Sequence, residues 1–223
     1  SAELIVPSIK TQEALKKYGL NKDMHIIPTG LELEKFDPKN KNDTLINEIK
    51  QQYGIKDQFI ITFLGRVAKE KSIEVLIDAM KEVVKENDNV LCLIVGGGPQ
   101  LEELKELVRD DHISKYVIFT GPKPSKEVPS YYHLSNVFVS ASVTETQGLT
   151  YIEAMASGIP AIARYDKNLE NVIIDGVNGY FFKETNELVA ILLKMMSSDY
   201  SNMAKEAYLN AMQFSSEVFY EKV

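Results

Sequence analysis

Short apolar runs alternate with amphipathic stretches along most of the chain, and this alternation limits the fold more than any other feature of the sequence. The apolar runs are almost continuously hydrophobic, as in strands that are buried on both faces. The stretches between them repeat apolar residues at three- and four-residue spacing, which places those residues on one face of a helix. Strands of this kind that alternate with helices indicate βαβ crossovers. We therefore predict an α/β fold: a single Rossmann-like domain whose parallel sheet is covered by helices on both faces.

The individual elements follow from these patterns. Strands are predicted at 4–6, 25–28, 59–64, 90–95, 117–119, 137–139, 161–163 and 180–182. Helices are predicted at 11–18, 43–53, 73–84, 101–108, 128–134 and 149–156, and over most of 185–223. Gly54 has the position of a helix C-cap, and Ser72 has that of an N-cap for the next helix. The polar stretch 35–42, which contains Pro38, is the one segment with the composition of a linker. It is short, so we interpret it as an insertion-like loop within one domain.

Charge and cysteine content limit the partners. The 223 residues include 25 Lys and Arg against 32 Asp and Glu, which gives a net charge of −7. An acidic protein of this kind is a poor candidate for nucleic acid, whose phosphates select basic faces. The single cysteine, Cys92, lies in an apolar run and is expected to be buried, so no internal disulfide or multi-cysteine zinc site is predicted. No apolar stretch reaches the roughly 18 residues that a membrane span requires.

Ligands of parallel α/β sheets bind beyond the carboxyl ends of the strands, so the loops that follow the strands are the candidate binding loops. The first, 65–72, contains Arg66 and Lys71, whose charges suit a diphosphate, although a solvated basic loop has the same composition. The second contains three glycines, Gly96 to Gly98, which either let a ligand approach the backbone or form a tight turn. Leu101 stands where a dinucleotide fingerprint requires its third glycine, which disfavours a nicotinamide cofactor.

The third loop is stiffened by two prolines around Lys123. Its backbone could read a flat base by main-chain hydrogen bonds, and a plain turn is the alternative. The fourth loop, 142–148, leads into a predicted helix, and two glutamates stand eight residues apart across this junction, Glu145 and Glu153. Gly148 lies at the helix start, where free N–H groups and the helix dipole favour an anion.

Glu153 lies among apolar residues of the same helix, where a carboxylate requires a partner. A ribose diol is one candidate, because a carboxylate can accept from both hydroxyls, and a salt bridge to a nearby lysine is the other. The three histidines do not cluster, and no Asp-x-Asp is present for a divalent cation, so no metal site is predicted.

Taken together, these loops resemble the C-terminal domain of GT-B glycosyltransferases, in the retaining family 4 or group 1 branch. Residues 25–38 are similar to the family's I-P-N-G-V-D…F-x-P, 65–71 to its G-R…E-K-G, and 145–160 to its Glu-x7-Glu segment. Three further motifs follow the family's order: Val95 to Pro99, Phe119 to Gly121, and Asp175 to Gly179. Each motif is short, but six in the right order are specific. The segment 145–153 is especially similar to bacterial diacylglycerol glucosyltransferases.

The resemblance implies roles in binding a nucleotide sugar. Arg66 and Lys71 would grip the donor diphosphate and neutralise the leaving group. Glu145 would hold the hydroxyls of the donor sugar, and Glu153 would hold the ribose. The N–H groups at the start of the helix would contact phosphate and sugar, and the loop around Lys123 would lie along the base. The implied catalytic residues are Glu145, Arg66 and Lys71, and the implied donor-binding residues are Gly65, Arg66, Lys71, Gly97, Gly121, Pro122, Lys123, Glu145, Gly148, Leu149, Thr150 and Glu153.

The sequence departs from the family pattern at three places. Ser72 stands where the family has a glycine, and Thr29 stands where it has the asparagine before Gly30. Lys167 and Asn168 replace the usual glycine pair ahead of a late glutamate. This last change affects the side of the site that faces the acceptor.

The resemblance also implies a function for the whole protein. Residues 1–223 would be the donor-binding domain, with an N-terminal acceptor domain absent. The enzyme would move a hexose from UDP-glucose to a lipid or glycan with retention, without a metal or another cofactor, and this domain alone would bind the donor and transfer nothing. We expect a cytoplasmic protein with peripheral association at the inner membrane face. The alternatives are a non-catalytic nucleotide-binding or interaction module on the same fold and, less favoured, a nicotinamide oxidoreductase.

Overall fold

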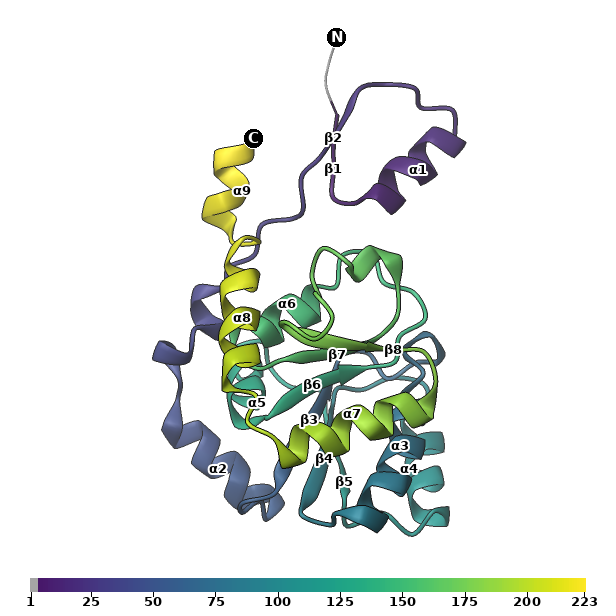
Figure 1. Ribbon diagram of the computed structural model, residues 1–223, viewed down its shortest axis with the longest axis vertical. Coiled ribbons are helices and arrows are strands. Elements are labelled where there is room, and N and C mark those ends of the chain that lie inside the picture. Colours follow the sequence, from purple (N-terminus) through teal and green to yellow (C-terminus); the bar gives the residue numbers. More distant parts are fainter. Residues whose placement is uncertain (1–3) are drawn as a thin grey trace.

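The computed structural model describes residues 4–223, and its core is a six-stranded parallel sheet (Figure 1). The strand order is β5-β4-β3-β6-β7-β8, and every neighbouring pair is parallel. This confirms the predicted α/β fold, although the first three residues of the predicted 1–223 domain lie outside the described part. The strands are β3 (Phe59–Leu64), β4 (Val90–Val95), β5 (Val117–Gly121), β6 (Val137–Ser140), β7 (Ala161–Arg164) and β8 (Gly179–Phe182).

Helices cover both faces of this sheet, as the continuous hydrophobic strands require. One face carries α3 (Ile73–Glu86), α4 (Leu101–Asp110) and α7 (Thr185–Ser197). The other carries α2 (Asp43–Tyr53), α5 (Val128–Leu134), α6 (Leu149–Ala156) and α8 (Ser201–Met212). Successive residues of β3 serve opposite layers: Ile61 packs with the first set of helices and Ile60 with the second. Cys92 is fully buried in the first layer, as predicted.

The strand order reverses between β3 and β6. The chain leaves β3 for α3 on one face and leaves β6 for α6 on the other. Two crossovers that diverge to opposite faces leave a crevice at the carboxyl ends of the two strands, which is where open α/β sheets bind ligands. The topology therefore singles out the loops after β3 and β6.

Four aromatic rings fix the elements beneath this crevice. Phe138 of β6 lies edge-on to Tyr132 of α5 and to Tyr151 of α6, with ring centroids 5.9 and 5.2 Å apart. Tyr132 in turn meets Phe36 edge-on at 5.8 Å. Edge-to-face packing is a favoured arrangement of aromatic rings. Because all four side chains are almost fully buried, α5 and α6 are held firmly against β6.

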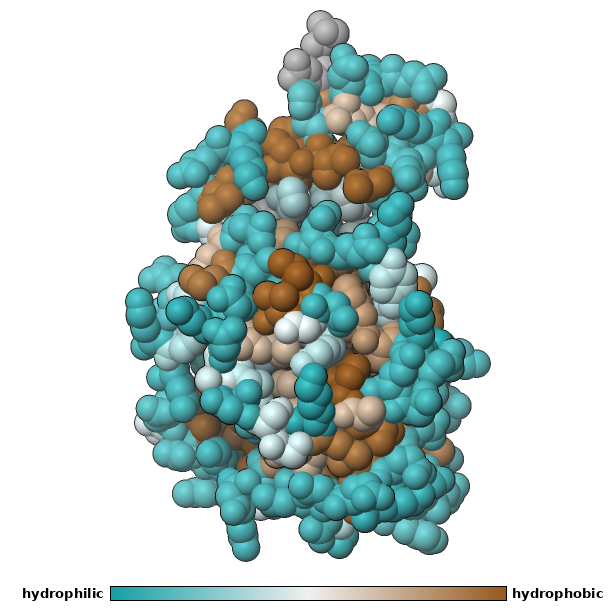
Figure 2. All heavy atoms as spheres, viewed as in Figure 1, coloured by the Kyte–Doolittle hydropathy of each residue, from teal (hydrophilic) through white to brown (hydrophobic). Residues whose placement is uncertain are grey.

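The first strands stand apart from this sheet. β1 (Leu4–Val6) and β2 (Met24–Ile26) form a two-stranded parallel sheet joined by α1 (Ile9–Lys17), and this β1–α1–β2 unit projects from the main body near α9 (Ser216–Lys222) (Figure 1). Helix α1 buries none of its residues, and Ile5, Ile9 and Ile26 are more than two-fifths exposed. Figure 2 shows hydrophobic residues gathered between the projecting unit and the main body.

The stretch with linker composition is a loop that packs on the main body. The 3₁₀ turns η1 (Glu34–Phe36) and η2 (Pro38–Asn40) occupy most of this region, and Phe36 is only 2% exposed. The extended connection runs through residues 27–30. Burial of the Phe36 ring thus holds this stretch against the main body in spite of its polar composition. Across residues 4–223, no helix combines the length and apolar character that crossing a bilayer requires.

Candidate functional site

The loop after β3 brings two basic side chains to the crevice between β3 and β6. Arg66 is exposed and, within the described residues, makes no side-chain hydrogen bond or ion pair. Lys71 ends the 3₁₀ turn η3 (Lys69–Lys71) and is about three-quarters buried. Both residues therefore lie on the loop that the topology selects, and Arg66 is available to an anion.

Ser72 holds the N-cap position of helix α3, as predicted, but its side chain does not cap the helix. Its backbone is left-handed, with φ 45° and ψ 46°, and its side chain makes no cap hydrogen bond. The hydroxyl instead donates to the carbonyl of Lys69 at 3.5 Å. A capping serine normally has an extended backbone, which aims its oxygen at the first turn, and the left-handed turn at Ser72 removes that aim.

Lys71 and Glu145, predicted from separate loops, come together in the structure. The Lys71 Nζ lies 2.9 Å from Glu145 Oε1, and it also donates to Ser142 Oγ at 3.4 Å. Glu145 is only 8% exposed. A buried carboxylate requires a charged or hydrogen-bonding partner, and Lys71 provides it. The loops after β3 and β6 are thus joined by one ion pair at the crevice.

The backbone of Glu145 is held on both sides. Its N–H donates to Asp166 Oδ2 at 3.1 Å, and its carbonyl accepts from Asn168 Nδ2 at 3.3 Å and from Lys10 Nζ at 3.2 Å. Asn168 lies in the 3₁₀ turn η4 (Lys167–Leu169), and Asp166 precedes that turn. Neither Asp166 nor Lys10 was predicted from the sequence. Asp166 follows β7 at the carboxyl edge, so the rule used for the other loops could have found it, whereas nothing in the sequence marks Lys10.

The start of helix α6 offers unpaired backbone donors. Gly148 has a left-handed backbone with φ 66°, and a Cβ there would lie 2.5 Å from Leu169 Cδ2. No side chain caps the helix, and within the described residues the N–H groups of Gly148, Leu149 and Thr150 have no acceptor. Such a helix start favours an anion. It opens on a cleft of about 470 Å³ lined by Lys71 and residues 144–150.

Glu153 lies further along α6 and has a different kind of partner. The fully buried Tyr132 donates its hydroxyl to Glu153 Oε2 at 3.2 Å. Burial raises the pKa of the Glu153 carboxyl above its usual value, while the hydrogen bond from Tyr132 and the charge of Lys35 act in the opposite direction. Within the described residues Glu153 makes no ion pair, so the lysine bridge considered for it is found at Glu145 instead.

The glycines after β4 are explained by contact between loops. A Cβ at Gly98 would lie 2.2 Å from the carbonyl oxygen of Val67, and one at Gly96 would lie 1.9 Å from that of Gly65. The Val67 N–H donates to the Gly97 carbonyl at 3.0 Å. These glycines therefore let the loop after β4 press against the loop that carries Arg66. A contact of Gly97 with a ligand stays a prediction.

The loop after β5 lies two strands away from the crevice. Lys123 donates to the Tyr53 hydroxyl at 3.2 Å, and its amino group lies 5.8 and 5.7 Å from the rings of Tyr53 and Tyr131. Lys123 is thus engaged by tyrosines of α2 and α5. The structure does not bring it into the cluster around Glu145, and the predicted contacts of Gly121, Pro122 and Lys123 with a base remain untested. Among residues 4–223, no three His, Cys, Asp or Glu side chains are grouped so that they could hold a metal ion.

Comparison with known proteins identifies relatives. The family model described as "Glycosyl transferases group 1" matches residues 46–213. The chain is 34% identical over 218 residues to an alpha-monoglucosyldiacylglycerol synthase of Acholeplasma laidlawii. The matched residues cover 96% of this chain and 55% of that protein.

Solved structures share the fold. The crystal structure of Anabaena Alr3699/HepE in complex with UDP and glucose has a TM-score of 0.87 at 21% identity, over 100% of this chain and 62% of that one. The C-terminal domain of a group 1 glycosyl transferase (LpcC) from Francisella tularensis has a TM-score of 0.72 at 26% identity, over 82% of this chain and 97% of that one. The chain therefore spans about half the length of the curated relative and nearly all of a C-terminal domain.

Proposed function

The chain belongs to the group 1 glycosyltransferases, and on that basis we propose that it is the donor-binding half of an enzyme that moves glucose from UDP-glucose to a lipid acceptor. One observation carries the proposal. Within the described residues, the Lys71–Glu145 pair, the N–H groups of α6 that lack an acceptor, and Arg66, which makes no side-chain bond, all lie on the two loops where the strand order reverses. This arrangement provides positive charge for a diphosphate beside a carboxylate that can accept from sugar hydroxyls.

The diphosphate is assigned to the basic side chains and the start of α6. When the bond between the sugar and the diphosphate breaks, negative charge develops on the departing phosphate oxygen. Arg66, Lys71 and the N–H groups of Leu149 and Thr150 would stabilise that charge, and fixed donors of this kind are an effective source of transition-state stabilisation. These groups supply the charge compensation, so we propose that transfer needs no metal.

The ribose is assigned to Glu153. Tyr132 occupies one side of a single carboxylate oxygen of Glu153 and leaves the other oxygen without a hydrogen-bond partner within the described residues. A carboxylate can accept further hydrogen bonds in that state, and a ribose diol offers two donors at the right spacing. The cost of burying this carboxylate would then be offset when the nucleoside binds.

The relatives support the identities of donor and acceptor. The Acholeplasma laidlawii relative is named as a synthase of a glucosylated diacylglycerol, and the HepE structure contains UDP and glucose. These names favour glucose, uridine and a lipid, and we propose retention on the same family grounds. The match to a C-terminal domain supports the assignment as the donor half. For the whole protein we propose a cytoplasmic location with peripheral attachment to the membrane that holds the lipid.

Calorimetric titration of the chain with UDP, UDP-glucose, GDP and ADP, without added metal, tests the donor site. We expect saturable one-site binding of the uridine ligands that is lost in Arg66→Ala and in Glu153→Ala. Arg109→Ala is the matched control, because Arg109 lies exposed on α4 and, among the residues that the structure describes, pairs only with Glu106, at 3.8 Å. Absence of binding by every nucleotide, or binding that both site variants leave intact, would favour a non-catalytic module instead.

A transfer assay tests whether this chain binds the donor but requires the rest of the enzyme for transfer. With UDP-glucose and diacylglycerol we expect this chain alone to form no glucolipid, because the acceptor would be held by the part of the enzyme outside it. Glucolipid formed by the chain alone would contradict this assignment while leaving the donor site in place.

A further inference from the structure

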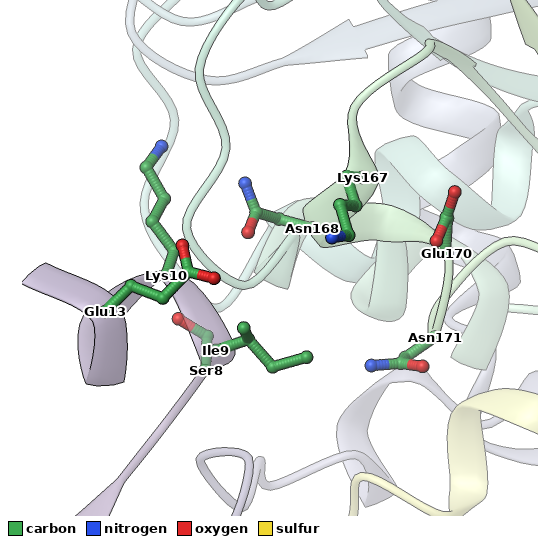
Figure 3. A pocket seen from close by; sticks show the side chains of 8 residues that line it. All are labelled: Ser8, Ile9, Lys10, Glu13, Lys167, Asn168, Glu170 and Asn171. Carbon is green, nitrogen blue, oxygen red and sulfur yellow. The ribbon is translucent and has the colours of Figure 1, made fainter.

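A lysine of the projecting unit reaches the centre of the proposed donor site. Lys10 lies in the first turn of α1, and its amino group donates to the carbonyl of Glu145 at 3.2 Å, across 135 positions of sequence. Figure 3 shows Lys10 and Asn168 on opposite walls of a cleft of about 310 Å³ between α1 and η4. Both side chains donate a hydrogen bond to the Glu145 carbonyl, which therefore connects the two walls of the cleft.

Glu145 depends on such bonds for its orientation. It lies in the irregular loop between β6 and α6, where no helix or sheet ladder fixes the peptide groups. Its N–H is fixed by Asp166, and its carbonyl is fixed by Asn168 and Lys10. The direction of the carboxylate follows from the position of the Cα between these two peptide groups. Loss of Lys10 would leave the carbonyl with the Asn168 amide as its side-chain donor.

The proposed diphosphate ligands depend less on the Glu145 backbone. The amino group of Lys71 pairs with the Glu145 carboxylate, but the Lys71 backbone is placed by η3. The N–H groups at the start of α6 are placed by that helix, which the rings beneath the crevice hold in position. Movement of the Glu145 backbone would therefore affect the hexose more than the diphosphate. The affinities for UDP and for UDP-glucose can therefore separate an effect on the diphosphate from an effect on the hexose.

We propose that Lys10 is a positioning residue for the hexose. The position of the β1–α1–β2 unit against the loop after β6 would then help to set the direction of the Glu145 carboxylate, through the bond from Lys10. The inference rests on the proposed function, in which Glu145 holds the hydroxyls of the donor sugar. It assigns to the projecting unit a direct effect on sugar binding through a bond to the backbone, without contact between Lys10 and the donor.

The test compares UDP with UDP-glucose in calorimetric titrations of the chain. For Lys10→Met we expect UDP-glucose to bind about fivefold more weakly, because one charge-assisted hydrogen bond is lost, while UDP binds as in the original chain. Lys10→Arg should restore the affinity for UDP-glucose, since a guanidinium can donate to the same carbonyl. Lys17→Met is the matched control, because Lys17 lies on the same helix, is exposed and makes no side-chain hydrogen bond within the described residues.

Each outcome separates the inference from the function on which it rests. Equal weakening of UDP and UDP-glucose in Lys10→Met would overturn the inference, because it would indicate contact with the diphosphate or loss of the fold. No change for either ligand would overturn it as well. If the original chain binds neither ligand, the proposed function fails and the inference fails with it.

Discussion

The two glutamates of the site are held by chemically different partners. Glu145 faces the ammonium group of Lys71, whereas Glu153 faces the neutral hydroxyl of Tyr132. The partner of Glu153 stabilises its charge less than a cation would, so burial dominates and raises its pKa. The spacing of the two residues in sequence carries no trace of this difference, because Lys71 and Tyr132 come from other elements.

Replacement of Glu153 by Gln should make the free energy of unfolding less sensitive to pH. The folded-state pKa of Glu153 lies above its unfolded value of 4.5, so the stability it contributes is full at low pH and is lost as pH rises through the folded pKa. We therefore expect the variant to gain stability relative to the original chain as the pH rises above the unfolded value of 4.5. Urea unfolding across this range measures the difference.

Glu170→Gln is the control for this prediction. Glu170 also accepts from a tyrosine, with Tyr165 Oη at 2.6 Å from Oε1, but both side chains are exposed. The exchange there should alter stability little at any pH. A Glu153→Gln curve that runs parallel to the original across the whole range would show that burial of this carboxyl has no energetic effect.

At the scale of elements, periodicity was sufficient for most of the fold. All six strands of the sheet and the helices between them lie where apolar runs and helical stripes predicted them. The exception is Ser72, which holds the predicted N-cap position but does not cap α3 with its side chain. The left-handed turn there belongs to the loop that places Lys71 against Glu145, a tertiary contact that no short window of sequence contains.

Ser72→Gly should stabilise the junction between η3 and α3. A left-handed backbone costs about 1–2 kcal/mol for a residue with a Cβ, and glycine avoids that cost while losing some chain entropy. We expect a gain of about 1 kcal/mol in the free energy of unfolding. Denaturant titration measures it, with Ser72→Ala as the control, because alanine removes the same hydroxyl but keeps the Cβ. An equal gain in both variants would locate the effect in the hydroxyl and contradict backbone strain.

For the whole molecule, the two sheets should differ in stability. The six-stranded sheet has helices on both faces, whereas β1 and β2 form a two-stranded sheet whose helix buries no residue. Two strands alone are marginally stable in water. Hydrogen exchange followed by mass spectrometry should therefore show faster exchange in β1 and β2 than in the fully buried β4. Equal protection of β1, β2 and β4 would mean that the chain unfolds as one cooperative unit.

The candidate site could be predicted in its parts but not in its connections. The sequence placed Arg66, Lys71, Glu145 and Gly148 on strand-end loops, and the strand order explains why those loops meet. The link through Lys10 depends on how the projecting unit lies against the sheet-bearing body, and neither motif nor periodicity reports that arrangement. Lys123 is the opposite case. It lies on a candidate loop, but its side chain contacts Tyr53 and does not reach the residues around Glu145.

The central claim is that a nucleoside diphosphate binds at the start of α6, between the loops after β3 and β6. Heteronuclear NMR of the chain during addition of UDP tests this most directly, through the free N–H groups of Gly148, Leu149 and Thr150. We expect these signals to shift saturably, while those at the start of α8 stay in place. Helix α8 begins next to Tyr200, which accepts a hydrogen bond from Asn136 at the amino end of β6, away from the carboxyl ends of the strands. Saturable shifts that leave all three signals of α6 unmoved would contradict the claim.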